Sequence, residues 1–313
     1  MLEKQATRDA YGKALVELGK KYNDVVVLDA DLSKSTKTSD FAKEFPERFI
    51  NAGIAEQNMI GMAAGLAAAG KKVFASSFAV FAAGRAFEQV RNSVAYARLN
   101  VKICASHAGI TVGEDGGSHQ AVEDIAVMRA VPNMTVVVPA DGVSTKKAVF
   151  AVYEHEGPVY MRLGRPAVPL IYDERLDFKI GKGIELRSGK DVTLIACGIM
   201  VGKALEAAEL LAKEGIEASV IDMHTIKPLD EELIIRKAEE TGAILTLEEH
   251  SIIGGLGGAV CEVVSEKCPV LVKRMGIKDL FGQSGKPDEL MEYYGLTVGH
   301  IMNNVHNLLE IKP

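Results

Sequence analysis

Short apolar runs alternate with helical segments along most of the chain, and this alternation limits the possible folds more than any other feature. Continuous apolar runs are typical of parallel strands that helices cover on both faces of a sheet. In the first half of the chain, strands are predicted at residues 25–29, 73–76, 101–105, 135–138 and 159–163. This half is therefore predicted to form a doubly wound α/β domain, with Thr7 capping its first helix.

The alternation stops between residues 167 and 190, where Pro169, acidic residues and glycines interrupt any regular period. We interpret this stretch as a linker. Alternation then resumes, with strands predicted at residues 192–197, 218–222, 243–247 and 270–273. A chain of 313 residues is long enough for two cores. The sequence thus predicts an α/β protein with two doubly wound, mostly parallel domains, residues 1–166 and a smaller one at residues 191–313.

Charge and composition exclude several classes of protein. The net charge of −6 gives no electrostatic case for nucleic acid or an anionic membrane as a partner. No apolar run reaches the ~20 residues needed to span a bilayer, and the first residues lack the pattern of a signal peptide, so a cytoplasmic location is expected. The four cysteines and seven histidines are scattered without metal-ligand spacing. No metal site is predicted, and the cysteines are expected to be buried.

Glu56 is the one carboxylate in residues 51–70, a stretch of small and apolar residues that is predicted to be helical after Gly53. Because its many alanines and glycines allow neighbouring backbones to approach on several sides, we expect a buried helix. A buried carboxylate is costly unless it is paired or has a raised pKa. The alternative is that Glu56 faces water in the first turn, where the helix dipole favours it.

Residues 106–120 form a glycine-rich loop directly after the predicted strand at residues 101–105. The loops at the carboxyl ends of parallel strands are where ligands bind in open α/β sheets. This loop contains His107 and His119, two acidic residues and three hydroxyl groups, and so offers proton-transfer groups at neutral pH. The alternative is a surface loop made of residues that favour turns.

Several segments together carry a resemblance to a known family. They are Ala6-Thr-Arg8, Asp29-Ala-Asp-Leu-Ser-Lys-Ser35, Gly53-Ile-Ala-Glu-Gln57, Phe78-Ala-Val-Phe81 and Gly113-Glu-Asp-Gly-Gly-Ser-His-Gln120. In this order they resemble the pyrimidine-binding half of transketolases. The resemblance continues through Pro132-Asn-Met134, Pro139-Ala-Asp141 and Arg162-Leu-Gly-Arg165 into the second domain, and so covers essentially the whole chain. It implies a pyrimidine-binding domain followed by a transketolase C-terminal domain.

The chain lacks the Gly-Asp-Gly…Asn motif with which thiamin-diphosphate enzymes of this family hold Mg²⁺ and the diphosphate. The resemblance therefore implies the C-terminal subunit of a split transketolase. Its cofactors would be thiamin diphosphate and Mg²⁺, the metal bound mainly by an N-terminal subunit that carries the motif. Two copies of each subunit are expected in an α2β2 heterotetramer that acts on sugar phosphates of the pentose phosphate pathway.

Residue roles are implied by the resemblance, position by position. Glu56 matches the glutamate that hydrogen-bonds the aminopyrimidine ring and promotes its imino tautomer. Phe78 and Phe81 match aromatic residues that pack around that ring, while Asp31 matches a residue at the boundary of cofactor and subunit. Where the family usually has a tyrosine a little further on, this chain has Gly84-Arg85.

Other matches concern the sugar. Asp115 matches the acid that contacts a hydroxyl of the ketose donor, and His119 matches a histidine beside the reacting carbon. Sugar-phosphate ligands are implied at Arg8, Ser35, His107 and Arg165. Arg162 is an alternative to Arg165, because both lie in one short turn.

The reaction implied is the transfer of a two-carbon ketol unit between sugar phosphates, and three alternatives stay open. A 1-deoxyxylulose 5-phosphate synthase shares the Gly-Ile-Ala-Glu-Gln stretch. The beta subunit of a 2-oxo-acid dehydrogenase also lacks the diphosphate motif, although it would not need the sugar-phosphate ligands. The third alternative is an inactive regulatory or scaffold relative, against which the intact Glu56, Asp115 and His119 argue.

Overall fold

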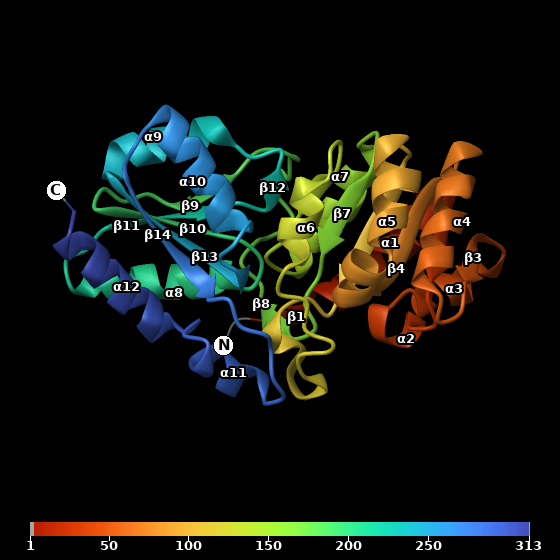
Figure 1. Ribbon diagram of the computed structural model, residues 1–313, viewed down its shortest axis with the longest axis horizontal. Helices are drawn as coiled ribbons and strands as arrows, with labels where there is room; N and C mark the ends of the chain where they lie inside the picture. Colours follow the sequence, from red (N-terminus) through yellow and green to blue (C-terminus); the bar gives the residue numbers. More distant parts are fainter. Residues whose placement is uncertain (1–2, 313) are drawn as a thin grey trace.

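Two α/β lobes lie side by side along the long axis of the computed structural model, which describes residues 3–312 (Figure 1). The first lobe contains the red-to-green part of the chain and the second the green-to-blue part. Each lobe is built on a mostly parallel sheet, which confirms the predicted fold class. No helix within residues 3–312 is long and apolar enough to cross a membrane.

The first sheet has seven strands in the order β12-β6-β7-β5-β4-β2-β3, and every pair except β12 with β6 is parallel. The strands are β2 (Val25–Asp29), β3 (Phe49–Asn51), β4 (Lys72–Phe78), β5 (Val101–Ser106), β6 (Thr135–Val137), β7 (Val159–Arg162) and β12 (Thr225–Lys227). The sequence predicted all of these strands except the two edge strands β3 and β12. Both have only three residues, too few to show a clear period.

Helices cover both faces of this sheet. One face packs against α1 (Thr7–Lys21) and α7 (Gly142–Glu154), and the other against α4 (Glu56–Ala68), α6 (Asp124–Ala130) and the helical segment 80–96. In that segment π-type turns at Val80–Arg85 and Val90–Tyr96 flank α5 (Phe87–Gln89). The short helices α2 (Ser33–Thr36) and α3 (Ser39–Glu44) were not predicted.

Thr7 does not cap the first helix, because Ala6 occupies the cap position and Thr7 is already helical. The Thr7 hydroxyl instead accepts a hydrogen bond of 2.8 Å from the backbone N–H of Gly164. The predicted cap was wrong because this oxygen satisfies a distant backbone group rather than one in its own helix. The start of α1 is thereby tied to the segment that follows β7.

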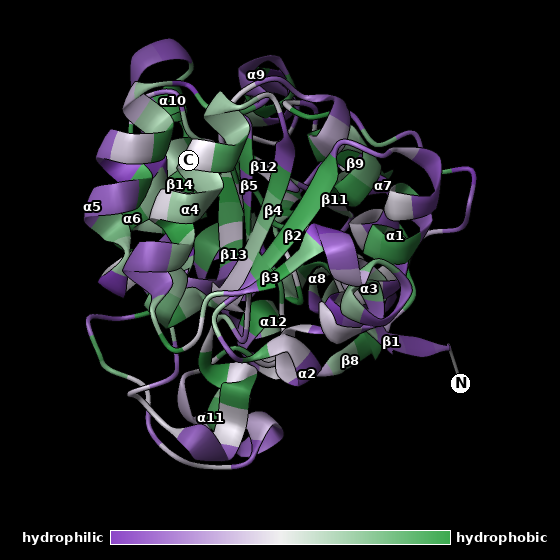
Figure 2. Cartoon of the chain, turned by 90° about the vertical axis from the view of Figure 1, so that its right-hand side faces the viewer, coloured by the Kyte–Doolittle hydropathy of each residue, from purple (hydrophilic) through white to green (hydrophobic). Residues whose placement is uncertain are grey.

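The second sheet has the order β14-β13-β10-β11-β9, with only β9 antiparallel to its neighbour. Its strands are β9 (Ile184–Arg187), β10 (Val192–Ala196), β11 (Ala218–Asp222), β13 (Ala243–Ser251) and β14 (Leu271–Ile277). The central strands β10, β11 and β13 are almost entirely buried, whereas outer turns of α5 and α9 are hydrophilic (Figure 2). The helices are α8 (Met200–Lys213), α9 (Glu231–Thr241), α10 (Leu256–Lys267), α11 (Pro287–Tyr293) and α12 (Val298–Glu310).

The segment interpreted as a linker, residues 167–190, contains two short strands. One is β8 (Ala167–Pro169), which pairs antiparallel with β1 (Lys4–Ala6), and the other is β9 at the edge of the second sheet.

The expectation that all cysteines are buried was partly wrong. Cys104 and Cys197 are buried, but Cys261 and Cys268 are partly exposed because both lie toward the outer side of α10 and its end.

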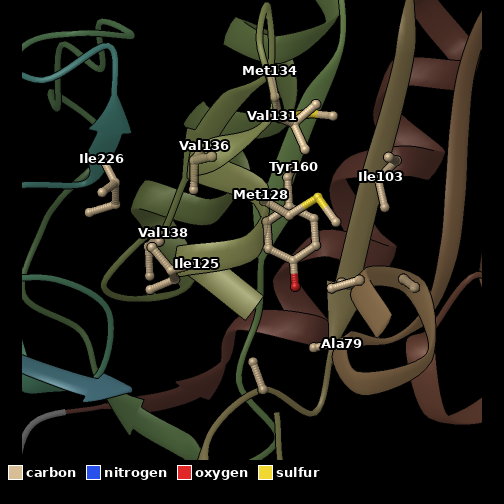
Figure 3. Close-up of a cluster of buried hydrophobic side chains, with 14 of the residues drawn as sticks. Ala79, Ile103, Ile125, Met128, Val131, Met134, Val136, Val138, Tyr160 and Ile226 are labelled. Atoms are coloured by element: carbon tan, nitrogen blue, oxygen red, sulfur yellow. The ribbon is translucent and has the colours of Figure 1, made fainter. Parts of the chain in front are cut away.

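The two lobes share one apolar core. β12 belongs by sequence to the second lobe, yet it pairs with β6 and extends the first sheet. Ile226 on β12 is 1% exposed and lies opposite Val136 and Val138 of the first lobe (Figure 3). Because buried apolar surface of both lobes lies in a single cluster, moving one lobe against the other would expose it to water. The loops between the lobes are therefore held in fixed relative positions.

Candidate active site

Most of the residues singled out in the sequence gather at the carboxyl ends of β4, β5 and β7. Phe78 ends β4, His107 follows β5, and Arg165 follows β7. Arg8 reaches them from the first turn of α1, since its Nη1 lies 3.2 Å from Nε2 of His107. Asp115 lies beside Arg165, and the carboxylate of Asp115 is 3.7 Å from Nη1 of Arg165. The parallel topology thus brings distant segments together at one edge of the sheet.

Four rings form an aromatic cluster in this region, which consists of Phe78, Phe81, His107 and His119. Phe78 stacks on His107 with 3.8 Å between ring centroids, and on Phe81 with 5.9 Å. The ring of His119 meets Phe81 edge-on at 5.5 Å and Phe78 at 6.3 Å. These are ordinary favourable geometries for aromatic rings. They give the cluster an apolar surface beside two imidazoles.

His107 is held as a neutral ring with a defined tautomer. Burial, followed by the positive charges of Arg8 and Arg165, lowers the pKa of His107 to about 3. Because a guanidinium can only donate, Nε2 of His107 accepts from Arg8 and the proton lies on Nδ1. Nδ1 then donates to Oγ of Ser106 at 2.8 Å. This imidazole can therefore orient Arg8 but does not gain charge near neutral pH.

Two guanidinium groups face this neutral histidine. Arg8 donates from Nη1 to the backbone oxygen of Ser35 at 3.0 Å, and burial lowers the pKa of Arg8. Its Nε has no hydrogen-bond partner among residues 3–312. Arg165 contacts the backbone oxygen of Val112 and the carboxylates of Glu114 and Asp115. Such a pair of guanidiniums suits an anion that carries several acceptor oxygens.

Arg162, the alternative to Arg165, points away from these groups. Its Nε donates to both carboxylate oxygens of Asp124, at 3.1 and 2.9 Å, and its Nη2 donates to two backbone oxygens. The side chain is only 6% exposed, whereas that of Arg165 is 35% exposed. Arg162 is therefore committed to contacts within the protein, and Arg165 is the arginine that remains open to a ligand.

Glu56 is the first residue of α4 and is 2% exposed. Both of its carboxylate oxygens accept from Nη1 of Arg85 at 2.9 Å. The expectation of a buried, paired carboxylate holds, and the alternative that it faces water is wrong. Arg85 is half exposed and lies 4.5 Å above the ring of Phe81, so it links Glu56 to the aromatic cluster. The sequence placed Arg85 after Phe81 but gave no sign that it faces Glu56.

The prediction that α4 is approached closely on several sides was wrong for one side. Residues 57, 58, 61 and 65 are exposed, and a Cβ on Gly61 or Gly65 would have no neighbour within 4 Å. The buried side, with Met59, Ile60 and Ala63, packs on the first sheet. Within residues 3–312, therefore, the small residues of α4 are only partly used for packing.

Asp31 and Ser35 lie in the loop after β2. Asp31 has a φ of 64° and exchanges two hydrogen bonds with Asn51, at 3.0 and 3.1 Å. The loop is organised by Asp29, which is fully buried and accepts from the hydroxyls of Thr36 and Thr38 at 2.7 and 2.9 Å. Asp29 thereby fixes the turn that presents the Ser35 carbonyl to Arg8. Within residues 3–312, no cluster of three or more potential metal ligands is present.

The arrangement offers three chemical capabilities in one region. A buried carboxylate beside aromatic rings can bind and exchange a proton with a flat nitrogen heterocycle. Arg8 and Arg165 can hold an anionic group. His119 lies against the ring of Phe81 and Asp115 lies beside Arg165; both are at least partly exposed and can contact polar groups of a ligand.

Comparison with known families gives matches along most of the chain. Residues 3–170 match the model of the transketolase pyrimidine-binding domain, and residues 181–301 match that of the transketolase C-terminal domain. The first match corresponds to the first lobe and the second match to the second lobe.

Individual relatives are similar over nearly the whole chain. A Methanocaldococcus jannaschii protein named "Putative transketolase C-terminal section" is 59% identical, with 92% of each chain covered. The 6-deoxy-6-sulfo-D-fructose transketolase subunit of a Clostridium species is 47% identical over 99% of this chain and 97% of its own. A solved structure described as a split gene transketolase, an inactive beta4 tetramer, is 56% identical, with a TM-score of 0.92 and coverage of 99% and 100%.

Proposed function

Because the chain belongs to the transketolase family and corresponds to its C-terminal section, we propose that it transfers a two-carbon ketol unit between sugar phosphates as one subunit of a split enzyme. One observation carries the proposal. The carboxylate of Glu56, the aromatic cluster and the anion-binding Arg8 and Arg165 lie in one region at the carboxyl edge of the first sheet. A cofactor ring and an anionic sugar can thus be bound side by side.

The residues present fit the aminopyrimidine ring of thiamin diphosphate. Glu56 is buried, and its partner Arg85 is half exposed and can turn toward water, leaving the carboxylate for a ring nitrogen. Phe78 and Phe81 would pack against the ring, and Asp31 would lie at the edge of the site. When bound, thiamin diphosphate supplies the nucleophilic carbon and the electron sink that carbon–carbon cleavage requires. Glu56 would hold or give up a proton at the ring nitrogen.

The diphosphate and its Mg²⁺ would be bound by a partner subunit that carries a Gly-Asp-Gly…Asn motif. A relative that forms a β4 tetramer is described as inactive. In our proposal, activity therefore requires an α2β2 assembly in which both kinds of subunit are present.

The substrate would be a phosphorylated ketose. Arg8, Arg165 and the neutral His107 would bind its phosphate together with Ser35, while Asp115 would contact a hydroxyl and His119 the reacting end. One relative acts on a sulfonated sugar, whose anionic group is also tetrahedral but carries less charge. Two guanidiniums near one anion favour the dianionic phosphate over the monoanionic sulfonate.

The test is to co-express this chain with a candidate partner that contains the Gly-Asp-Gly…Asn motif. Ketol transfer to ribose 5-phosphate is then measured with xylulose 5-phosphate and with 6-deoxy-6-sulfofructose as donors. Transfer from xylulose 5-phosphate that needs both chains supports the proposal. A stable complex that binds thiamin diphosphate but turns over only pyruvate or branched 2-oxo acids would contradict it.

A further inference from the structure

Two adjacent carboxylates, Glu248 and Glu249, lie near the carboxyl end of β13 in the second lobe, and both are buried. They face different parts of the molecule. Glu248 accepts from the backbone N–H groups of Leu256 and Gly257 at 2.7 and 2.8 Å, at the start of α10 in its own lobe. Glu249 instead accepts, through Oε1, from the backbone N–H of Thr111 at 2.7 Å. Glu249 thus reaches across to the loop of the first lobe.

Thr111 occupies the middle of the glycine-rich loop at residues 106–120. It lies four positions after His107 and four before Asp115, the two groups proposed to contact phosphate and sugar. A hydrogen bond to a backbone N–H at this point restrains both sides of the loop. Because Glu249 belongs to the second lobe, this restraint comes from outside the sheet that carries the site.

The carboxylate of Glu249 also packs closely against the backbone of the loop. Gly109 has a φ of 81°, and a Cβ placed there would lie 2.3 Å from the carboxyl carbon of Glu249. The carboxylate therefore rests directly on the loop backbone, where only glycine leaves room. The backbone oxygen of Glu249 accepts from Nη2 of Arg162 at 3.0 Å, and Arg162 in turn holds Asp124. Glu249 is thus fixed to the first lobe by its side chain and by its backbone.

A second contact supports the other end of the loop. Nε2 of Gln120 donates to the backbone oxygens of Ile110 and Gly113, each at 3.1 Å, and to that of Gln283 at 3.0 Å. Gln283 comes from the second lobe, just before α11. The loop is therefore attached to the second lobe at two places, of which the Glu249 contact is the nearer to His107 in sequence.

We propose that Glu249 is a positioning residue for the sugar-phosphate site: it holds the backbone of the loop so that His107 and Asp115 keep their places. The inference rests on the proposed function. The second lobe then contributes to substrate binding without touching the substrate. Since a displacement of ~1 Å at a reacting group can cost 10²-fold in rate, a loosened loop is expected to weaken both binding and turnover.

The experiment compares Glu249→Ala and Glu249→Asp, which remove or shorten the acceptor, with Glu249→Gln, which keeps an oxygen in its place. Glu248→Ala is the matched control, because it removes an adjacent buried carboxylate that does not face the loop. Hydrogen exchange of the full chain, followed by mass spectrometry, reports on residues 106–116, with residues 57–68 of α4 as internal reference. Kinetics of the complex with its partner give KM and kcat for the ketose phosphate.

Glu249→Ala and Glu249→Asp are expected to speed exchange in residues 106–116 by about tenfold or more without changing the reference segment. KM for the ketose phosphate should rise about tenfold, while the Kd of thiamin diphosphate stays within twofold, because only the loop is loosened. Glu249→Gln should restore both values to near wild type. Glu248→Ala should leave the loop unchanged even if it lowers stability.

Unchanged loop exchange in both Glu249→Ala and Glu249→Asp would overturn the inference. So would an equal effect of Glu248→Ala on the loop, which would indicate general destabilisation. The exchange measurement does not depend on the reaction, so it decides about Glu249 even if the wild-type complex shows no ketol transfer. That last result would instead contradict the proposed function.

Discussion

The carboxyl ends of the two parallel sheets carry polar side chains that are used in different ways. In the first lobe, Arg85, Asp115 and Arg165 remain 35–50% exposed around the aromatic cluster. In the second lobe, Asp222, Glu248 and Glu249 are buried and bonded to groups of the protein itself. The same architecture thus leaves groups open to a ligand in one lobe and uses them for internal contacts in the other. In our proposal, the first lobe supplies the reacting groups and the second lobe holds them in place.

The largest expected effect comes from Glu56→Gln, which tests the chemical side of this comparison. If Glu56 exchanges a proton with the cofactor ring, the neutral amide should lower kcat by about 10²–10⁴-fold. The assay is ketol transfer by the complex of both subunits. Glu88→Gln, an exposed carboxylate on the neighbouring α5, should keep the wild-type rate. An assembled Glu56→Gln complex with full activity would show that this carboxylate is structural.

Ile226→Ala tests whether the second lobe is joined to the first through a shared core. Ile226 is buried on β12 against the first sheet, so truncating it should destabilise the protein by about 2–5 kcal/mol. Urea unfolding should show both lobes losing stability in a single transition. The matched control is Ile253→Ala, whose side chain is 59% exposed and whose loss should change stability by less than about 0.5 kcal/mol. Two separate transitions, only one of them shifted by Ile226→Ala, would show that the two lobes unfold independently.

Arg8→Ala tests the open anion-binding groups of the first lobe. Loss of charge-assisted hydrogen bonds to phosphate, each worth about 1.5–3 kcal/mol, should raise KM for the ketose phosphate about tenfold or more. Binding of thiamin diphosphate should not change. Lys13→Ala, an exposed cation on the same helix, serves as control. Equal KM values for Arg8→Ala and wild type would place the phosphate elsewhere.

The last expected effect concerns the second lobe and its response to pH. Burial raises the pKa of Asp222 to about 7, although the hydroxyl of Tyr172 donates to it. The folded chain therefore keeps this proton up to about pH 7, whereas the unfolded chain loses it near pH 4. Stability should fall as pH rises through this window, by up to about 1.4 kcal/mol per pH unit.

Asp222→Asn should remove that pH dependence, because the amide does not ionise and can still accept from Tyr172. Urea unfolding at pH 5 and pH 8 measures the difference between the two proteins. If the wild type loses no more stability than Asp222→Asn between these values, the carboxylate is already ionised in the folded chain.

Much of the fold could be predicted from the sequence because buried parallel strands leave short, largely apolar runs, as at residues 25–29 and 101–105. The edge strand β12 could not, since a strand of three residues is defined by its pairing with β6 about ninety residues earlier. The cap predicted at Thr7 failed for a similar reason. A hydroxyl satisfies whichever backbone group folding brings near, and here that group is Gly164.

For the candidate site, the sequence indicated most of the groups but few of their contacts. Family motifs pointed to His107, His119 and Arg165, and the structure brings them to one edge of the sheet. No family motif indicated a role for Arg85 or Glu249. The first is recognised only by its contact with Glu56, 29 positions away, and the second by a backbone N–H 138 positions away. Pairings between such distant positions depend on the three-dimensional fold.

We propose that this chain supplies the pyrimidine and sugar side of a site that another subunit completes. The most direct test is a calorimetric titration with thiamin diphosphate in the presence of Mg²⁺. It is carried out on this chain alone, on the partner alone and on their mixture. We expect tight binding of thiamin diphosphate only for the mixture. Equally tight binding by this chain alone would contradict the claim.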